Sequence, residues 1–251
     1  MGLVDRIRQR VSSTGMMNTL RYGGAVMANC LYGWCQEMLF DLKFSGRLLC
    51  GNEKTRFKWL GANDVYHTDY SVMPLIFSLV LIGEQDVLVD VGCGKGRVIN
   101  YWLSQGYANK MVGLELDPEV AAQTAQQFER WEQVEIIAGD AVANLPDEGT
   151  VFYFYNPFEW DKVVQFEERL ALVSSHKEVT VIYYNPKSLP VFHNGNWDVQ
   201  FIDFEQDLGI KRWDRINKYH QLAILRRRVA AKNRRAVADP PLNRQEQAGI
   251  S

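Results

Sequence analysis

The chain has 251 residues, of which 47% are hydrophobic and 23% are charged, and its formal net charge is −2. Such a composition is ordinary for a soluble globular protein with a full core. The length allows one large domain, or one domain with an appendage. The near-neutral charge excludes a bulk electrostatic attraction to nucleic acid, so we expect no nucleic-acid partner.

The sequence shows neither a membrane-spanning segment nor an export signal. No uninterrupted apolar stretch reaches the roughly 18 residues that a membrane span needs, and residues 1–10 lack the apolar core of a signal peptide. The four cysteines form no CxxC pair, and no histidine stands at metal-ligand spacing from them. We therefore expect no metal site and a reducing, cytoplasmic location.

The first 65 residues differ from the rest of the chain. They are rich in aromatic residues, Gly and Met, which predicts a helical N-terminal extension over residues 1–65 that caps the main domain. Within it, LVDRIRQRV at residues 3–11 is basic and weakly amphipathic. Two interpretations of this segment stay open: a packed or frayed helix, and weak peripheral contact with a membrane surface.

From residue 84 onward, strand patterns alternate with helix patterns. Near-continuous aliphatic runs are typical of parallel strands that are covered on both faces. The alternation predicts a parallel sheet with helices on both faces, and ligands of such sheets bind beyond the C-terminal strand ends. The predicted strands are residues 86–92, 110–117, 134–140, 150–156 and 178–185, with helices at 72–82, 97–106, 118–131 and up to 173.

Two further strands are predicted near the C-terminal end, at residues 197–205 and 219–227. No long helix pattern separates them, so we expect this pair to be antiparallel. The main domain then extends over residues 66–228. Residues 229–251 have the composition of a disordered basic tail, with contact to an anionic surface as the other interpretation.

The first predicted strand leads into a glycine-rich loop, VGCGKGR at residues 91–97. A phosphate-binding loop needs GxxxxGK followed by Ser or Thr, but Gly96 follows Lys95 here. A dinucleotide-binding loop needs GxGxxG, whereas Gly92, Gly94 and Gly96 are spaced GxGxG. The loop matches neither pattern, so the ends of the next strands have to identify its ligand.

Carboxylates end the next two predicted strands. Glu115 stands 19 residues after Gly96, at the position where a carboxylate binds ribose hydroxyls in nucleoside-binding folds. Asp140 ends the third strand, in IIAGDA, where it can meet an adenine amino group. Asp90 places a further acid beside the loop, suited to a positively charged group. These residues predict an adenosine ligand with a free ribose.

The motifs DVLVDVGCGKGR, GLELD, IIAGDA and YNPF, in this order, resemble those of the class I S-adenosylmethionine-dependent methyltransferases. FDLKFSG at residues 40–46 resembles the stretch before the core in a bacterial branch with YNPF. The resemblance covers residues 64–228. It implies an α/β fold with a seven-stranded, mostly parallel, doubly wound sheet and an antiparallel last strand. It also implies S-adenosyl-L-methionine as the cofactor.

The resemblance further implies which residues bind the cofactor. Asp90 and the Gly92–Gly96 loop would hold the methionine part, Glu115 the ribose and Asp140 the adenine. The segment YHTDYSVMP at residues 66–74, before the first strand, is expected to cross the cofactor and contact it. The expected cofactor-binding set is completed by Tyr66, Thr68, Cys93, Gly94, Arg97, Leu116, Ala141 and Asn156.

Asn156-Pro157-Phe158 ends the fourth strand, where the methyl group is expected to point. In amino-group methyltransferases, a similar Asn-Pro-Pro-aromatic motif accepts amine hydrogens through Asn and main-chain carbonyls. One proline is missing here, which puts a planar amine acceptor in doubt. Asn185-Pro186 repeats the same ending, which favours a simple turn as the other interpretation of both motifs.

We expect catalytic roles for Asn156, Phe158 and Tyr70, and no general base is identified. The predicted function is S-adenosylmethionine-dependent methyl transfer by in-line displacement to an unidentified N or O acceptor, which is a small molecule, a glycan or a protein side chain. Two other functions stay open: an NAD-dependent reductase and a catalytically silent cofactor-binding subunit.

Overall fold

The computed structural model describes residues 16–49, 54–63, 67–210 and 221–227. Its strands are β1 Leu88–Val91, β2 Met111–Glu115, β3 Val134–Ala138, β4 Val151–Phe154, β5 Thr180–Tyr184, β6 Trp197–Asp203 and β7 Gln221–Arg227. Its helices are α2 Met16–Ser45, α3 Met73–Ser78, α4 Arg97–Ser104, α5 Pro118–Phe128 and α6 Trp160–Val173, with short 3-10 helices η1 Lys58–Leu60 and η2 Leu189–Phe192.

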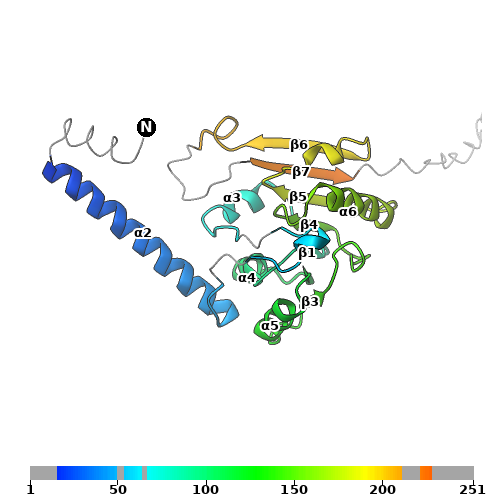
Figure 1. Cartoon of the computed structure of the whole chain (residues 1–251), viewed down its shortest axis with the longest axis horizontal. Coiled ribbons are helices and arrows are strands. Elements are labelled where there is room, and N and C mark those ends of the chain that lie inside the picture. The colour runs from blue at the N-terminus through cyan, green and yellow to red at the C-terminus, as the bar shows by residue number, and fades with distance from the viewer. Residues whose placement is uncertain (1–15, 50–53, 64–66, 211–220, 228–251) are drawn as a thin grey trace, which may run out of the picture.

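The seven strands form one sheet in the order β3-β2-β1-β4-β5-β7-β6 (Figure 1). The first five are mutually parallel, and β7 pairs antiparallel with both β5 and β6. The expected seven-stranded α/β sheet of the class I methyltransferase type is therefore confirmed. The late antiparallel pair is confirmed as well.

Side chains that alternate along each strand build a core on either face of the sheet. Leu88 packs with α3 and α4 on one face, whereas Val89 and Val91 pack with α6 on the other. Asp90 alternates with these apolar residues and belongs to the face that carries α3 and α4. A carboxylate is thereby placed at the C-terminal end of the central strand β1, next to the glycine loop.

Strands β1 to β6 are all shorter than predicted: each loses residues at its C-terminal end, and β1, β2, β4 and β5 lose them at the N-terminal end as well. The ladder stops at Val91, Glu115 and Ala138, because the following residues turn over the strand ends instead of pairing. The start of α5 agrees with its sequence signal: Asp117 accepts a hydrogen bond from the main-chain nitrogen of Glu119, and Pro118 fills the first turn.

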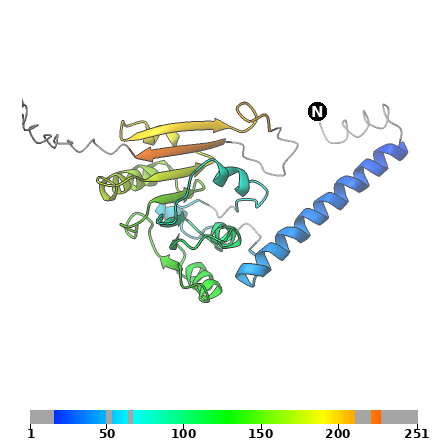
Figure 2. The same ribbon diagram turned by 180° about the vertical axis from the view of Figure 1, so that it is seen from behind.

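The N-terminal region divides into two parts with different positions. Helix α2 contacts the domain only near its C-terminal end, beside α4 and α5, and its other half extends away from the sheet (Figures 1 and 2). Residues 54–63 lie over the strand ends instead, where Ala62 forms an antiparallel bridge with Phe158. This second segment is the described part of residues 1–65 that lies over the strand ends.

Other expectations for the termini fall outside the described residues, namely those for residues 3–11 and 229–251. Across the part of the chain that the structure describes, no helix has both the length and the hydropathy to cross a membrane.

Candidate active site

The glycine loop after β1 depends on two close approaches that only glycine allows. Gly96 has a φ of 78°, and a Cβ atom there would lie 2.4 Å from the ring of Phe128 on α5. Gly92 has a φ of 77°, and a Cβ atom there would lie 2.9 Å from Cβ of Pro157. Both positions need a left-handed backbone as well as free space. The loop therefore lies directly against the Asn-Pro-Phe motif after β4.

Glu115 at the end of β2 connects the glycine loop to the start of α5. One carboxylate oxygen accepts a hydrogen bond from the main-chain nitrogen of Gly94 and the other accepts one from Asp117, both at 2.9 Å. Burial raises the pKa of this carboxyl, and the two main-chain donors oppose that rise. Each oxygen keeps a lone pair for a further donor, which suits a pair of ribose hydroxyls.

Asp90 is buried beside Glu115. Burial, followed by the charge of Glu115, raises the pKa of Asp90 to about 8. The two groups therefore repel each other when both are ionised, and a cation bound next to Asp90 would relieve that repulsion. The amino group of a bound ligand is a cation of this kind.

Both carboxylate oxygens of Asp140, which follows β3, accept hydrogen bonds from the protein. One oxygen accepts a hydrogen bond from Nζ of Lys162 at 2.5 Å, and the other accepts one from the main-chain nitrogen of Val142 at 2.9 Å. Sequence reasoning missed Lys162, which lies 22 positions further along the chain on α6. The sequence signal for it was weak, because a lysine near the start of a surface helix is common.

A cavity of about 780 Å³, part of it open to solvent, joins these groups. It includes six of the expected site residues, namely Gly92, Glu115, Leu116, Asp140, Ala141 and Phe158. The remaining lining residues were not predicted from the sequence: Thr55, Leu60, Ala62, Asn63, Leu114, Gly139, Tyr155, Pro157 and Lys162. The cavity thus extends from the strand ends of β2 and β3 to the motif after β4.

Residues 54–63 close this cavity and bind the Asn-Pro-Phe motif through its main chain. The main-chain nitrogen of Asn63 donates to the carbonyl of Pro157, and the side-chain amide of Asn63 donates to the carbonyl of Asn156, both at 2.9 Å. In return, the main-chain nitrogen of Glu159 donates to the carbonyl of Gly61 at 2.8 Å. The motif is therefore fixed from outside by a segment far from it in sequence.

Asn156 has a left-handed backbone, with a φ of 44°. Its side-chain oxygen accepts a hydrogen bond from the hydroxyl of Tyr183 at 3.1 Å, and that hydroxyl accepts one from the main-chain nitrogen of Ser188. This chain of donors leaves the NH₂ of Asn156 for another partner. Asn185 has a similar φ of 52°, so the turn interpretation holds for the backbone of both motifs.

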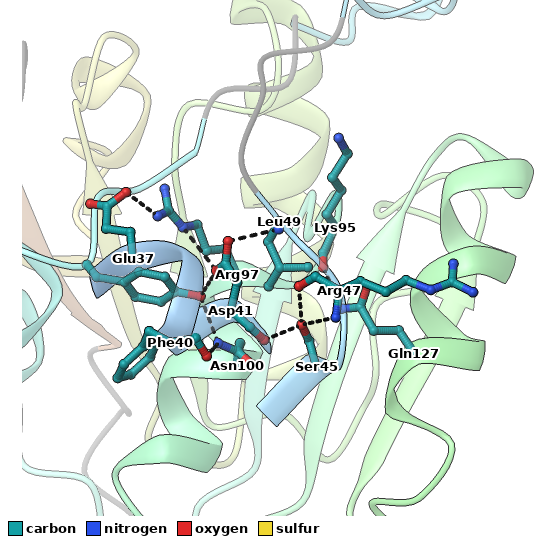
Figure 3. A network of polar contacts seen from close by, with 11 residues as sticks. Glu37, Phe40, Asp41, Ser45, Arg47, Leu49, Lys95, Arg97, Asn100 and Gln127 are labelled. Atoms are coloured by element: carbon teal, nitrogen blue, oxygen red, sulfur yellow. Dashed lines mark hydrogen bonds and ion pairs between the residues drawn. The ribbon is translucent and has the colours of Figure 1, made fainter. Parts of the chain in front are cut away.

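Two expected site residues, Tyr70 and Arg97, contact α2 rather than the cavity. The hydroxyl of Tyr70 donates to Asp41 at 2.6 Å and accepts from Asn100 at 2.8 Å. The guanidinium of Arg97 lies over the Tyr70 ring and forms an ion pair with Glu37 at 2.6 Å (Figure 3). Neither residue lines the cavity. Their side chains join α2 to α4, and their expected roles stay predictions.

The other expected residues take varied positions. Thr68 is buried, and its hydroxyl forms a hydrogen bond of 2.6 Å with that of Tyr153, the neighbour of Asp90 in the sheet. The side chain of Cys93 is buried in the core, and burial raises the pKa of its thiol. Tyr66 lies outside the described residues. No group of three or more His, Cys, Asp or Glu residues suited to a metal occurs among the described residues.

Comparison with known proteins identifies the domain. Residues 88–182 match the family model described as "Methyltransferase domain". Similar solved structures include an RNA methyltransferase from Salinibacter ruber in complex with S-adenosyl-L-homocysteine, at 19% identity and a TM-score of 0.45, covering 66% of this chain and 95% of that one. Precorrin-6y C5,15-methyltransferase from Geobacter metallireducens is similar at 10% identity and a TM-score of 0.48, covering 65% and 90%.

Human N-acetylserotonin methyltransferase in complex with SAM is similar at 15% identity and a TM-score of 0.47, covering 62% of this chain and 51% of that one. Among curated proteins, the comparison finds no relative. The matched residues 88–182 hold the glycine loop, Glu115, Asp140 and the Asn-Pro-Phe motif, within the strand order that these motifs imply. Residues 88–182 therefore form part of a methyltransferase domain with the class I strand order, and its cofactor is S-adenosyl-L-methionine.

Proposed function

We propose that the domain transfers a methyl group to an acceptor that enters the cavity beside Asn156-Pro157-Phe158. One observation carries this proposal: a single cavity connects Glu115 and Asp140 with Phe158. In an in-line displacement, the protein acts mainly by holding the nucleophile and the methyl carbon in line. A cavity that is continuous between the cofactor side and the motif provides that arrangement.

Each carboxylate of the site has a proposed role in binding the cofactor. Glu115 accepts the ribose hydroxyls, Asp140 accepts the adenine amino group, and Asp90 pairs with the amino group of the methionine part. The main chain of the Gly92–Gly96 loop approaches the cofactor closely. When bound, S-adenosylmethionine supplies an electrophilic methyl group on a sulfonium.

The hydrogen bonds around Asn156 favour an oxygen acceptor over a planar amine. An amine would donate to the side-chain oxygen of Asn156 and to the carbonyl of Pro157, and Tyr183 and Asn63 already occupy one lone pair of each of these atoms. The NH₂ of Asn156 remains, and an NH₂ donates to oxygen. We therefore propose that the acceptor presents an oxygen to this amide.

Whether the acceptor oxygen is neutral or ionised depends on which bases line the cavity. A neutral hydroxyl must lose its proton to a base before or during transfer. The described lining of the cavity contains no histidine, and its two carboxylates, Glu115 and Asp140, already accept protein hydrogen bonds. An oxygen that ionises by itself near neutral pH needs no base. We propose a carboxylate or an acidic phenol, attached to an apolar body that packs on Leu60, Ala62 and Phe158.

Two measurements test this function in sequence. Calorimetric titration of the purified chain with S-adenosylhomocysteine should give micromolar binding, and titration with NADH should give none. Transfer of a labelled methyl group is then measured on matched pairs of aromatic acceptors that differ only in carrying a carboxylate, a phenol or an amine. Labelling of the amines alone would contradict the oxygen acceptor. Cofactor binding without transfer to any acceptor would favour a catalytically silent subunit.

We also propose that the protein works in the cytoplasm. The thiols of Cys35 and Cys93 are unpaired, which suits a reducing compartment. Fractionation of cells that produce the chain, followed by thiol labelling, tests this location. Recovery outside the cytoplasm with oxidised cysteines would contradict it.

A further inference from the structure

Helix α2 carries an exposed apolar face that no described part of the chain covers. Leu31, Trp34, Leu39 and Leu42 recur at spacings of three to five residues, which places them along one side of the helix. Trp34 is 54% exposed and Leu39 is 61% exposed. Monomeric proteins seldom leave a row of large apolar side chains of this kind in water.

A different side of the same helix from that of Leu31, Leu39 and Leu42 packs on the domain, near the C-terminal end of α2, and Trp34 lies at the boundary between the two sides. Asp41 there is fully buried and accepts hydrogen bonds from Tyr70 and from the main-chain nitrogen of Leu49 (Figure 3). Glu37 on this side pairs with Arg97. The orientation of α2 about its own axis is therefore fixed by its polar contacts. Leu39 and Leu42 are exposed as a consequence of those contacts, whereas Leu31 and Trp34 are exposed because they lie in the part of α2 that extends away from the sheet (Figures 1 and 2).

The two terminal segments of the sequence are more basic than the rest of the chain. Residues 1–36 contain four arginines and one aspartate, and residues 226–251 contain seven Lys or Arg and two Asp or Glu. Because the whole chain has a formal charge of −2, the residues between these two ends are strongly acidic. Positive charge is thus concentrated in the two terminal segments of the sequence.

We propose that α2 docks the protein on an anionic bilayer surface, with its exposed apolar face at the level of the headgroups. A helix with an apolar face and basic flanks lies in the plane of such an interface. Trp34 and the neighbouring Tyr32, which is 68% exposed, have the amphipathic rings that prefer this depth. Helix α2 lacks the hydropathy to cross the bilayer, so it lies on the surface.

Charge complementarity favours a bilayer over a second copy of the chain. Two copies paired through α2 would bring together two sets of N-terminal arginines, with only Asp5 of each to compensate within residues 1–36. An anionic leaflet neutralises the same arginines and covers the apolar face at once. The acidic domain is then repelled from the surface, which leaves the cavity open to an acceptor.

Cosedimentation of the full chain with vesicles tests the proposal. The partition coefficient is measured on phosphatidylcholine vesicles with and without one third phosphatidylglycerol, at low and high salt. We expect the anionic lipid to raise it at least about tenfold, and high salt to remove most of the gain. The double variant Trp34→Glu/Leu39→Glu should lower it at least about tenfold, because charged side chains replace apolar ones in the interface.

Leu172→Glu provides the matched control, since Leu172 is equally apolar and 69% exposed but lies on α6. This variant should bind vesicles like the unchanged chain. Affinity for S-adenosylhomocysteine should be the same in all three proteins, which shows that each is folded. Equal binding to neutral and anionic vesicles, or full binding by the double variant, would overturn the proposal. Another outcome would assign the face to a second copy of the chain. In it, light scattering shows a dimer that only the double variant dissociates, and the unchanged chain does not bind vesicles.

Discussion

Asn63 donates from both its main-chain and its side-chain nitrogen to the two consecutive carbonyls of Asn156 and Pro157. The three residues come from segments that are far apart in the sequence and meet only at the rim of the cavity. The contact fixes the motif that faces the acceptor. It also occupies one lone pair of a carbonyl that an amine acceptor would need.

Asn63→Ala should therefore impair transfer without weakening cofactor binding. Loss of the side-chain donor removes one hydrogen bond, worth about 1 kcal/mol, and transfer should fall about fivefold to tenfold. Single-turnover transfer and titration with S-adenosylhomocysteine measure the two effects separately. Asn194→Ala, in an exposed loop, is the control and should change neither. A loss of cofactor affinity in Asn63→Ala would mean that this segment shapes the cofactor side as well.

The pKa of Asp90 predicts how stability depends on pH. The carboxyl titrates at about 8 in the folded protein, against an ordinary value of 3.8. Between these two values the folded state holds a proton that the unfolded state has lost, so the stability of the ligand-free protein falls as pH rises through this window. Thermal denaturation from pH 5 to pH 9 should show this fall in the unchanged chain. Asp90→Asn should show a smaller one and be more stable at pH 8.

The same group predicts the pH dependence of cofactor binding. A cationic amino group binds the ionised form of Asp90, so the affinity for S-adenosylhomocysteine should rise by up to about tenfold per pH unit below 8 and then level off. Asp90→Asn should bind weakly and lack this dependence. An unchanged chain whose affinity is flat from pH 6 to pH 8 would remove Asp90 from the cofactor site.

Glu115→Ala should weaken binding of S-adenosylhomocysteine by about 1–3 kcal/mol, the usual loss for hydrogen bonds to a charged group. Because Glu115 also accepts from Gly94 and Asp117, part of that loss comes from a looser glycine loop. An analogue without ribose hydroxyls separates the two contributions. It should bind the unchanged chain weakly and lose little further affinity in Glu115→Ala.

The sequence predicted the sheet and the carboxylates for the same physical reason. Aliphatic strands, glycine turns and acids at strand ends are local patterns, and parallel strands bring their C-terminal ends together. Asn63 and Lys162 were missed because their roles depend on contacts with residues far along the chain. The contacts of Tyr70 and Arg97 with α2 were missed as well, because closeness in sequence to the motifs does not say where a side chain points.

Asp140 should determine the preference for adenine. If it accepts from the adenine amino group, the 6-oxo analogue of S-adenosylhomocysteine should bind the unchanged chain at least about tenfold more weakly, since two acceptors then face each other. Asp140→Ala should remove most of this preference. Lys162→Met keeps the carboxylate and should retain the preference, although overall affinity falls. Competition titration measures all three proteins. Equal preference in Asp140→Ala would reassign the adenine contact.

Variants of Asn156 and Asn185 distinguish a catalytic role of the Asn-Pro-Phe motif from a simple turn. Both have a left-handed φ, so alanine at either position adds backbone strain of about 1–2 kcal/mol. Glycine removes the side chain without that strain. Asn156→Gly should keep the affinity for S-adenosylhomocysteine and lose transfer about tenfold or more, because the NH₂ that faces the acceptor is gone. Asn185→Gly should preserve both, since Asn185 follows β5, whereas Asn156 directly precedes Pro157 and Phe158 in the cavity lining. Full transfer by Asn156→Gly would reduce the motif to a turn, and the acceptor would then have to be held by Phe158 and the segment around Asn63 alone.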